Sequence, residues 1–161
     1  MKTILITGAT SGIGLAAAKK LANEKNQLIL CGRRQRKLDE ISEELSKSAN
    51  VLSLCFDVSN KNEVNRLLND LPEQFSSVDI LINNAGNAHG LDTIQDGSLD
   101  DWDNMIDSNV KGLLYVSRVI IPKMIEQKCG HIINIGSLAG REVYEKGNIC
   151  LLYTSPSPRD I

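Results

Sequence analysis

Short apolar runs alternate with amphipathic segments along residues 2–136 of this chain. The runs are apolar at consecutive positions, which is typical of strands buried on both faces of a parallel sheet. Parallel strands need long connections, and the segments between the runs have helical periodicity. The pattern predicts strands at 2–7, 27–31, 50–56, 78–82 and 131–136, and helices at 12–24, 34–48, 60–71 and 99–125. The expected fold class is α/β, with a doubly wound parallel sheet.

Several helix ends are marked by their residues. Asn60 and Ser98 precede the third and fourth predicted helices, and each is followed three positions later by an acid, Glu63 and Asp101 respectively. This spacing is typical of a capping box, so both residues are predicted to be N-caps. Pro122 lies near the end of the fourth helix, where we expect a kink or a termination.

A glycine-rich turn joins the first predicted strand to the first predicted helix. Glycines allow a sharp turn and a close approach to a ligand, and the free N–H groups of a helix start attract phosphate. The spacing differs from the G-x-G-x-x-G of dinucleotide-binding Rossmann folds, and a turn without a ligand is the alternative. The residues expected to hold a pyrophosphate are Gly8, Thr10, Ser11, Gly12, Ile13 and Gly14.

Two arginines, Arg33 and Arg34, follow the second predicted strand. Proteins that bind NAD place an acid here to hold the ribose 2′-OH. Two guanidinium groups suit a 2′-phosphate instead, because they donate charge-assisted and bidentate hydrogen bonds. The sequence therefore favours NADP(H) over NAD(H). The alternative is that both arginines form the solvated start of a helix.

The composition favours one globular domain with a small-molecule ligand. With 18 basic and 20 acidic residues in 161, the net charge of −2 gives no reason to expect nucleic acid or a membrane surface as partner. No apolar run approaches the roughly 18 residues of a membrane span, and the first strand leaves no room for a signal peptide. We therefore expect a cytoplasmic protein. His89 and His131 have no partners at metal-binding spacing, so no metal site is predicted.

Four motifs occur in an order that resembles the short-chain dehydrogenase/reductase family. Thr7 to Gly14 fits the family's TGxxxGxG turn, and residues 83–86 (Asn-Asn-Ala-Gly) fit its NNAG motif. Residues 109–112 (Asn-Val-Lys-Gly) fit NVxG, and residues 135–137 (Ile-Gly-Ser) fit the strand end that carries the catalytic serine. The resemblance covers residues 1–149 and implies an NADP-binding Rossmann domain.

Two further stretches resemble one branch of that family. Residues 31–35 (Cys-Gly-Arg-Arg-Gln) and 78–83 (Val-Asp-Ile-Leu-Ile-Asn) are similar to the corresponding stretches of NADP-dependent 3-hydroxy acid and serine dehydrogenases. This branch implies a small hydroxy or carbonyl compound, such as a 3-hydroxy acid, as the substrate.

The resemblance also implies cofactor contacts. Asp57 would accept a hydrogen bond from the adenine amino group, and Val58 would supply a backbone contact. Asn84 would lie near a cofactor ribose, and Ala85 and Gly86 would keep side chains away from it. A helix-capping aspartate and an ordinary turn are the alternatives for these two segments.

Two catalytic roles follow from the same resemblance. Ser137 would hydrogen-bond the carbonyl or hydroxyl of the substrate and orient it for hydride transfer. Asn109 would kink the long helix and hold a water of the proton relay. Without the resemblance, Ser137 would be taken for a turn residue and Asn109 for a solvated polar residue.

The family's Tyr-x-x-x-Lys pair is missing. Counting from Ser137 places its two slots at Cys150 and Thr154, and the loss of a general acid/base lowers turnover by roughly 10²–10⁴-fold. Prolines at 156 and 158 forbid the long helix that the family has here. Residues 150–161 resemble a translated sequencing-library adapter, so we expect a non-native tail and a missing carboxyl-terminal part.

These observations favour a parent oxidoreductase that transfers a hydride between NADP(H) and a small hydroxy or carbonyl compound. The family resemblance implies a homo-oligomer, dimer or tetramer, for the parent. The alternative from another class is a non-catalytic NADP(H)-binding or regulatory module. A P-loop or flavodoxin-like protein is disfavoured, because the chain has no G-x-x-x-x-G-K-[ST] motif.

Overall fold

The computed structural model describes residues 1–90 and 92–137. The strands are β1 (Lys2–Thr7), β2 (Asn26–Gly32), β3 (Asn50–Cys55), β4 (Ile80–Asn83) and β5 (His131–Asn134). The helices are α1 (Gly12–Leu21), α2 (Gln35–Leu45), α3 (Lys61–Asn69), the short η1 (Glu73–Phe75), α4 (Leu99–Ile106), η2 (Asp107–Gly112) and α5 (Leu113–Glu126). All five predicted strands are present, and η1 is an addition to the predicted elements.

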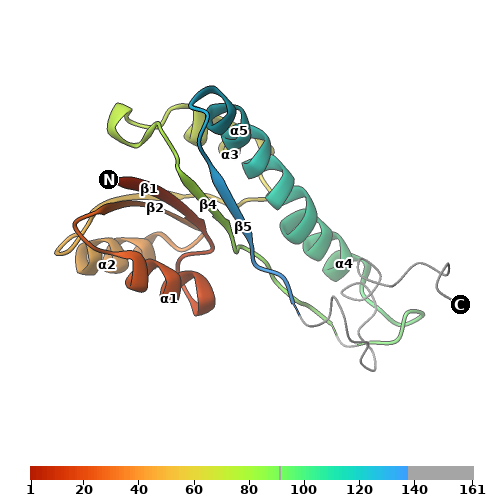
Figure 1. Ribbon diagram of the computed structural model, residues 1–161. Coiled ribbons are helices and arrows are strands. Elements are labelled where there is room, and N and C mark those ends of the chain that lie inside the picture. The colour runs from red at the N-terminus through yellow and green to blue at the C-terminus, as the bar shows by residue number, and fades with distance from the viewer. Residues whose placement is uncertain (91, 138–161) are drawn as a thin grey trace, which may run out of the picture.

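The strands form one parallel sheet in the order β3-β2-β1-β4-β5. The chain builds outward from β1 to β3, then returns to the other side of β1 for β4 and β5. Helices α1 and α2 lie on one face, and α3 and α5 lie on the other (Figure 1). The doubly wound Rossmann arrangement predicted from the sequence is thereby confirmed, and the order of strands reverses between β1 and β4.

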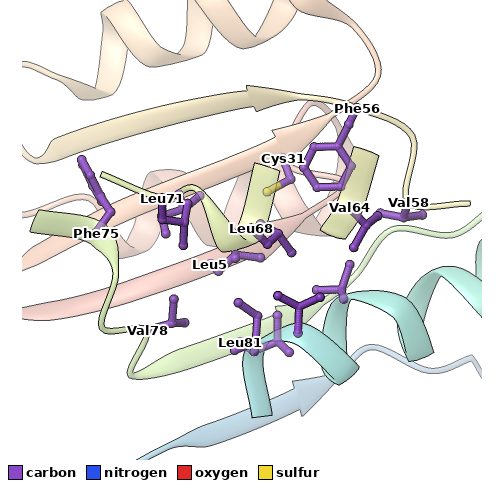
Figure 2. Packing of buried hydrophobic residues seen from close by; sticks show 14 of the residues in the cluster. Leu5, Cys31, Phe56, Val58, Val64, Leu68, Leu71, Phe75, Val78 and Leu81 are labelled. Atoms are coloured by element: carbon purple, nitrogen blue, oxygen red, sulfur yellow. The ribbon is translucent and has the colours of Figure 1, made fainter. Parts of the chain in front are cut away.

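The strands are apolar at consecutive positions because each face of the sheet packs against helices. In β1, Leu5 contributes to the cluster beneath α3 and α5, while Ile4 and Ile6 contribute to the cluster beneath α1 and α2. Figure 2 shows the first of these clusters, where Leu5 and Leu81 from the sheet lie close to Leu68 of α3. A buried apolar cluster on each face thus holds the sheet in place, and the candidate site lies at the carboxyl ends of its strands.

The helix predicted over residues 99–125 is confirmed in its extent, but it is not α-helical throughout. Helical backbone runs from Leu99 to Glu126, but the six residues Asp107–Gly112 form a π-helical segment between α4 and α5. A π segment widens one turn and shifts the faces of the helix on either side of it. Pro122 does not end the helix, since α5 continues to Glu126.

Among residues 1–90 and 92–137, strand β5 lies at an edge of the sheet, and all four of its residues are exposed. Ile132, Ile133 and Ile135 are each 38–39% exposed. Such an edge presents unpaired N–H and C=O groups to solvent.

No helix in the described ranges is long and apolar enough to cross a membrane. In the same residues, no group of three or more His, Cys, Asp or Glu side chains could hold a metal ion.

The Asp79 carboxylate is expected to make the free energy of unfolding decrease as the pH falls. Burial would raise the pKa of this carboxyl, but hydrogen bonds from Lys2 Nζ at 2.8 Å and the Thr3 N–H at 2.9 Å outweigh it and lower the pKa. A lowered pKa in the folded state contributes stability above about pH 4, which is lost as the pH falls further. Asp79→Asn should therefore lose less stability in acid than the unmodified chain. The test is to measure the thermal unfolding midpoints of both proteins at pH 6, 4 and 3. An equal decrease of the midpoint with falling pH in the two proteins would contradict the prediction.

Candidate functional site

A groove of about 1350 Å³ lies at the carboxyl ends of the strands, beside the point where the strand order reverses. Ligands of open α/β sheets bind at such a point. The groove is lined by the predicted residues Gly8, Thr10, Ser11, Gly12, Ile13, Arg33, Arg34, Asp57, Val58, Asn84, Ala85, Gly86, Asn109 and Ser137. Of the predicted site residues, Gly14 alone does not line it. The structure therefore brings together residues from six segments of the chain.

The three glycines of the turn are required for different structural reasons. Gly8 and Gly12 have φ of +66° and +54°, in the left-handed region that favours glycine. Gly12 has nothing within 4 Å of the place where a Cβ would lie, so it leaves open space at the start of α1. Gly14 is buried, and a Cβ there would lie 2.5 Å from the Gly8 carbonyl oxygen and would also collide with Asn84 Nδ2. Gly12 thus opens the groove, and Gly14 permits the packing beneath it.

Thr7 joins the ends of β1 and β4 beneath the groove. Its hydroxyl donates to the Ile82 carbonyl at 3.4 Å and accepts from the N–H groups of Asn84 and Ala85, both at 3.0 Å. Asn84 Nδ2 completes the connection by donating to the carbonyls of Thr7 and Gly8 at 2.9 and 3.2 Å. The sequence placed Thr7 in the turn but did not predict this role. The positions of Asn84 and Ala85 therefore depend on one buried hydroxyl.

Thr7→Val should destabilise the fold by about 2–4 kcal/mol, because the valine has the same shape but leaves the Asn84 and Ala85 N–H groups without an acceptor. Thr7→Ser retains the hydroxyl and is expected to recover most of the loss. Urea unfolding of both variants measures the effect. Equal stability of the valine and serine variants would show that the hydroxyl does not hold these strands together.

Arg34 lies against the glycine turn and contacts two hydroxyl groups. Its Nη2 donates to Thr10 Oγ1 at 2.7 Å and to Ser11 Oγ at 2.8 Å, and its Nε donates to Thr10 Oγ1 at 3.2 Å. Thr10 is only 6% exposed. These contacts hold a positive charge at the end of β2 close to the start of α1, where the helix dipole also favours an anion.

Arg33 points toward the end of β3. Its Nη1 lies 3.3 Å from Asp57 Oδ2, while Asp57 Oδ1 accepts from the N–H and hydroxyl of Ser59 at 2.9 and 2.8 Å. Burial would raise the pKa of Asp57, but the Ser59 hydrogen bonds and the Arg33 charge outweigh it and lower the pKa. Asp57 is therefore a carboxylate at neutral pH. The sequence did not predict this ion pair.

Asn109 lies in the π-helical segment and holds the loop after β4. Its Oδ1 accepts from the Asn87 N–H and its Nδ2 donates to the Asn87 carbonyl, both at 2.8 Å. Asn87 Nδ2 in turn donates to Ser108 Oγ at 3.1 Å. The structure places Asn109 in a π-helical segment, and the helix kink and the water-holding role that the family resemblance implies for this residue both stay predictions. No signal in the sequence pointed to Asn87.

Ser137 follows β5 and lines the same groove as the glycine turn. The end of β5 is tied to β4 by Asn83, whose Nδ2 donates to Asn134 Oδ1 at 2.9 Å and to Ser117 Oγ of α5 at 3.1 Å. The Ile135 N–H also donates to the Asn83 carbonyl at 2.9 Å. The slots at Cys150 and Thr154 and the predicted tail at 150–161 lie outside the described residues.

Comparison with known proteins agrees with this geometry. The family model described as short chain dehydrogenase matches residues 2–150. The NADP-dependent 3-hydroxy acid dehydrogenase YdfG of Shigella flexneri is 42% identical over 146 residues, which cover 91% of this chain and 58% of that protein. Sulfoacetaldehyde reductase 2 of Chromohalobacter salexigens is 44% identical over 147 residues, with the same coverage.

A solved structure, the closed form of serine dehydrogenase complexed with NADP⁺, superposes with a TM-score of 0.87. It is 39% identical to this chain, and the match covers 94% of this chain and 60% of that one. This chain thus spans less than two thirds of the length of these three proteins. The branch that the sequence predicted is confirmed, and the chain belongs to the short-chain dehydrogenase family.

Proposed function

We propose that this chain is the cofactor-binding part of an oxidoreductase that transfers a hydride between NADP(H) and a small hydroxy or carbonyl compound, such as a 3-hydroxy acid. The observation that carries the proposal is the pair Arg33 and Arg34 at the end of β2, in the same groove as the glycine turn and Ser137. Cationic and hydrogen-bonding groups stand where a ribose 2′-phosphate would lie.

The residues of the groove fit a dinucleotide. Gly12 leaves open space above the first turn of α1, where backbone N–H groups face a pyrophosphate. A Cβ at Gly8 would lie 2.9 Å from Ala85 Cα, so the turn and the NNAG segment approach each other as closely as their backbones allow. A shallow backbone surface of this kind accommodates a flat ligand without displacing side chains.

Different residues along the groove would contact different parts of the dinucleotide. Asp57 and Val58 would contact the adenine, Arg33 and Arg34 the 2′-phosphate, and residues 8–14 the pyrophosphate. Residues 84–86 would lie along a ribose. When bound, the nicotinamide supplies the hydride donor or acceptor, and Ser137 would orient the substrate oxygen toward it by donating a hydrogen bond. Asn109 would hold the water of the proton relay.

The names of three similar proteins support the substrate class. One relative is named for 3-hydroxy acids, another for sulfoacetaldehyde, and a solved structure is of a serine dehydrogenase. All three names describe small polar compounds with a hydroxyl or carbonyl group. The proposal includes a cytoplasmic, homo-oligomeric parent, with residues 1–149 as the NADP-binding domain and 150–161 as a non-native tail.

The test is to sequence across the junction between codons 149 and 150 in the source DNA and to express the uninterrupted protein. We expect tyrosine at position 150 and lysine at position 154, and reduction of NADP⁺ in the presence of a 3-hydroxy acid. The 161-residue chain should show roughly 10²–10⁴-fold lower turnover under the same conditions. A continuous frame without these residues, or a full-length protein without turnover on any 3-hydroxy acid, would refute the proposed activity.

A second candidate is a non-catalytic NADP(H)-binding module. It is favoured by one observation, the absence of Tyr-x-x-x-K spacing from this sequence, where Tyr144 is followed by Asn148 and Tyr153 by Ser157. The same sequencing experiment separates the two candidates, because a regulatory module predicts cofactor binding without turnover in the uninterrupted protein.

A further inference from the structure

We propose that Asp57 is a specificity-determining residue that competes with the 2′-phosphate for Arg33, so that the two arginines contribute unequally to the choice of NADP(H) over NAD(H). This inference rests on the proposed function. It goes beyond the sequence prediction, which treated Arg33 and Arg34 as equivalent.

Arg34 keeps its full charge available. Its hydrogen-bond partners, Thr10 and Ser11, offer neutral hydroxyls, and they occupy Nε and Nη2 only. In the described residues, the two N–H groups on Nη1 have no partner, and Arg34 has no carboxylate within ion-pair distance. A guanidinium held in place by hydroxyls and facing no anion is already arranged to bind a phosphate oxygen.

Arg33 is already paired with an anion. Its Nη1 faces Asp57 Oδ2 at 3.3 Å, across the part of the groove between the ends of β2 and β3. The Arg33 side chain is 63% exposed, so solvent screens the attraction within the pair. A 2′-phosphate bound by the other N–H groups of Arg33 would share the positive charge of this guanidinium with the Asp57 carboxylate.

Asp57 cannot follow Arg33 when it moves. Two hydrogen bonds from Ser59, at 2.9 and 2.8 Å, hold Oδ1, which leaves Oδ2 as the oxygen that faces Arg33. A fixed carboxylate beside a dianionic phosphate also repels it. Both effects lower the affinity for NADPH, and neither acts on NADH, which has a hydroxyl in place of the 2′-phosphate.

The experiment uses the 161-residue chain and fluorescence titration with NADPH and NADH. Asp57→Asn keeps an oxygen that can accept from Ser59 but removes the charge. Because Asp57 is also placed against the adenine that both nucleotides share, the measured quantity is the ratio of the two affinities. We expect the preference for NADPH over NADH to rise about threefold to tenfold. Glu43→Gln removes one negative charge from an exposed position of α2, outside the groove, and should change neither affinity.

Arg33→Met tests the competition itself. In the starting chain this change should weaken NADPH binding by less than about threefold, and in the Asp57→Asn background by about tenfold, because Arg33 is then free to bind the phosphate. Additive effects of the two substitutions, or an unchanged NADPH to NADH ratio in Asp57→Asn, would overturn the inference while NADPH binding supports the proposed function. If no variant binds either nucleotide, the proposed function fails and this inference fails with it.

Discussion

Replacing Gly14 with alanine is expected to destabilise the protein by about 3 kcal/mol. The added Cβ would lie 2.5 Å from the Gly8 carbonyl oxygen and would collide with Asn84 Nδ2, at a place where both atoms are already held by hydrogen bonds. Overpacking of a close contact costs about 1–3 kcal/mol, and a backbone oxygen has little freedom to yield. Urea unfolding measures the change in the free energy of unfolding.

Gly12→Asn is the matched control for this prediction. Asparagine tolerates the left-handed backbone at Gly12, and no atom lies within 4 Å of its Cβ position. The variant should therefore stay within about 1 kcal/mol of the original stability while its side chain blocks the groove. If Gly14→Ala folds as stably as Gly12→Asn, the close packing of the turn against Asn84 is not what requires a glycine there.

Arg34→Glu is expected to weaken NADPH binding by about 100-fold. A hydrogen bond to a charged group contributes about 1.5–3 kcal/mol, and a carboxylate in its place repels the phosphate as well. NADH has no 2′-phosphate, so its affinity should change by less than about threefold. Fluorescence titration with both nucleotides gives the two values, and an equal loss for NADPH and NADH would mean that Arg34 supports the fold of the groove instead of selecting the cofactor.

The fold could be predicted because its signals are local. Strand β1 has apolar residues at consecutive positions, and Asn60 caps α3 as predicted, with Oδ1 accepting from the N–H groups of Asn62 and Glu63 at 3.2 Å. Ser98 likewise caps α4, accepting from the Asp101 N–H at 3.3 Å. Patterns of this kind depend on neighbours in sequence, which is why they survive without knowledge of the tertiary structure.

Helix lengths were less predictable. Helix α1 ends at Leu21 instead of residue 24, and the Asn23 side chain accepts from the Lys25 N–H at 2.9 Å in a local turn that competes with further helix. The π segment around Asn109 depends on contacts with Asn87, which lies 22 residues away in sequence. Nothing in the periodicity of residues 99–125 contains that information.

The motifs predicted which residues line the site, but they did not predict the hydrogen bonds and ion pairs between those residues. Parallel topology brings the carboxyl ends of all strands to one edge, so residues that follow strands gather there without further assumptions. The pairing of Arg33 with Asp57 and of Thr7 with Asn84 depends on strand register and side-chain rotamers. These contacts span 24 and 77 residues of sequence, beyond the reach of local patterns.

The most direct test of the account is the relative affinity of the 161-residue chain for NADPH and NADH, measured by fluorescence titration under identical conditions. The groove at Gly12 predicts that both nucleotides bind, and the arginines after β2 predict that NADPH binds at least about tenfold more tightly. Equal affinities, or tighter binding of NADH, would contradict the assignment of this chain as the cofactor-binding part of an NADP-dependent oxidoreductase.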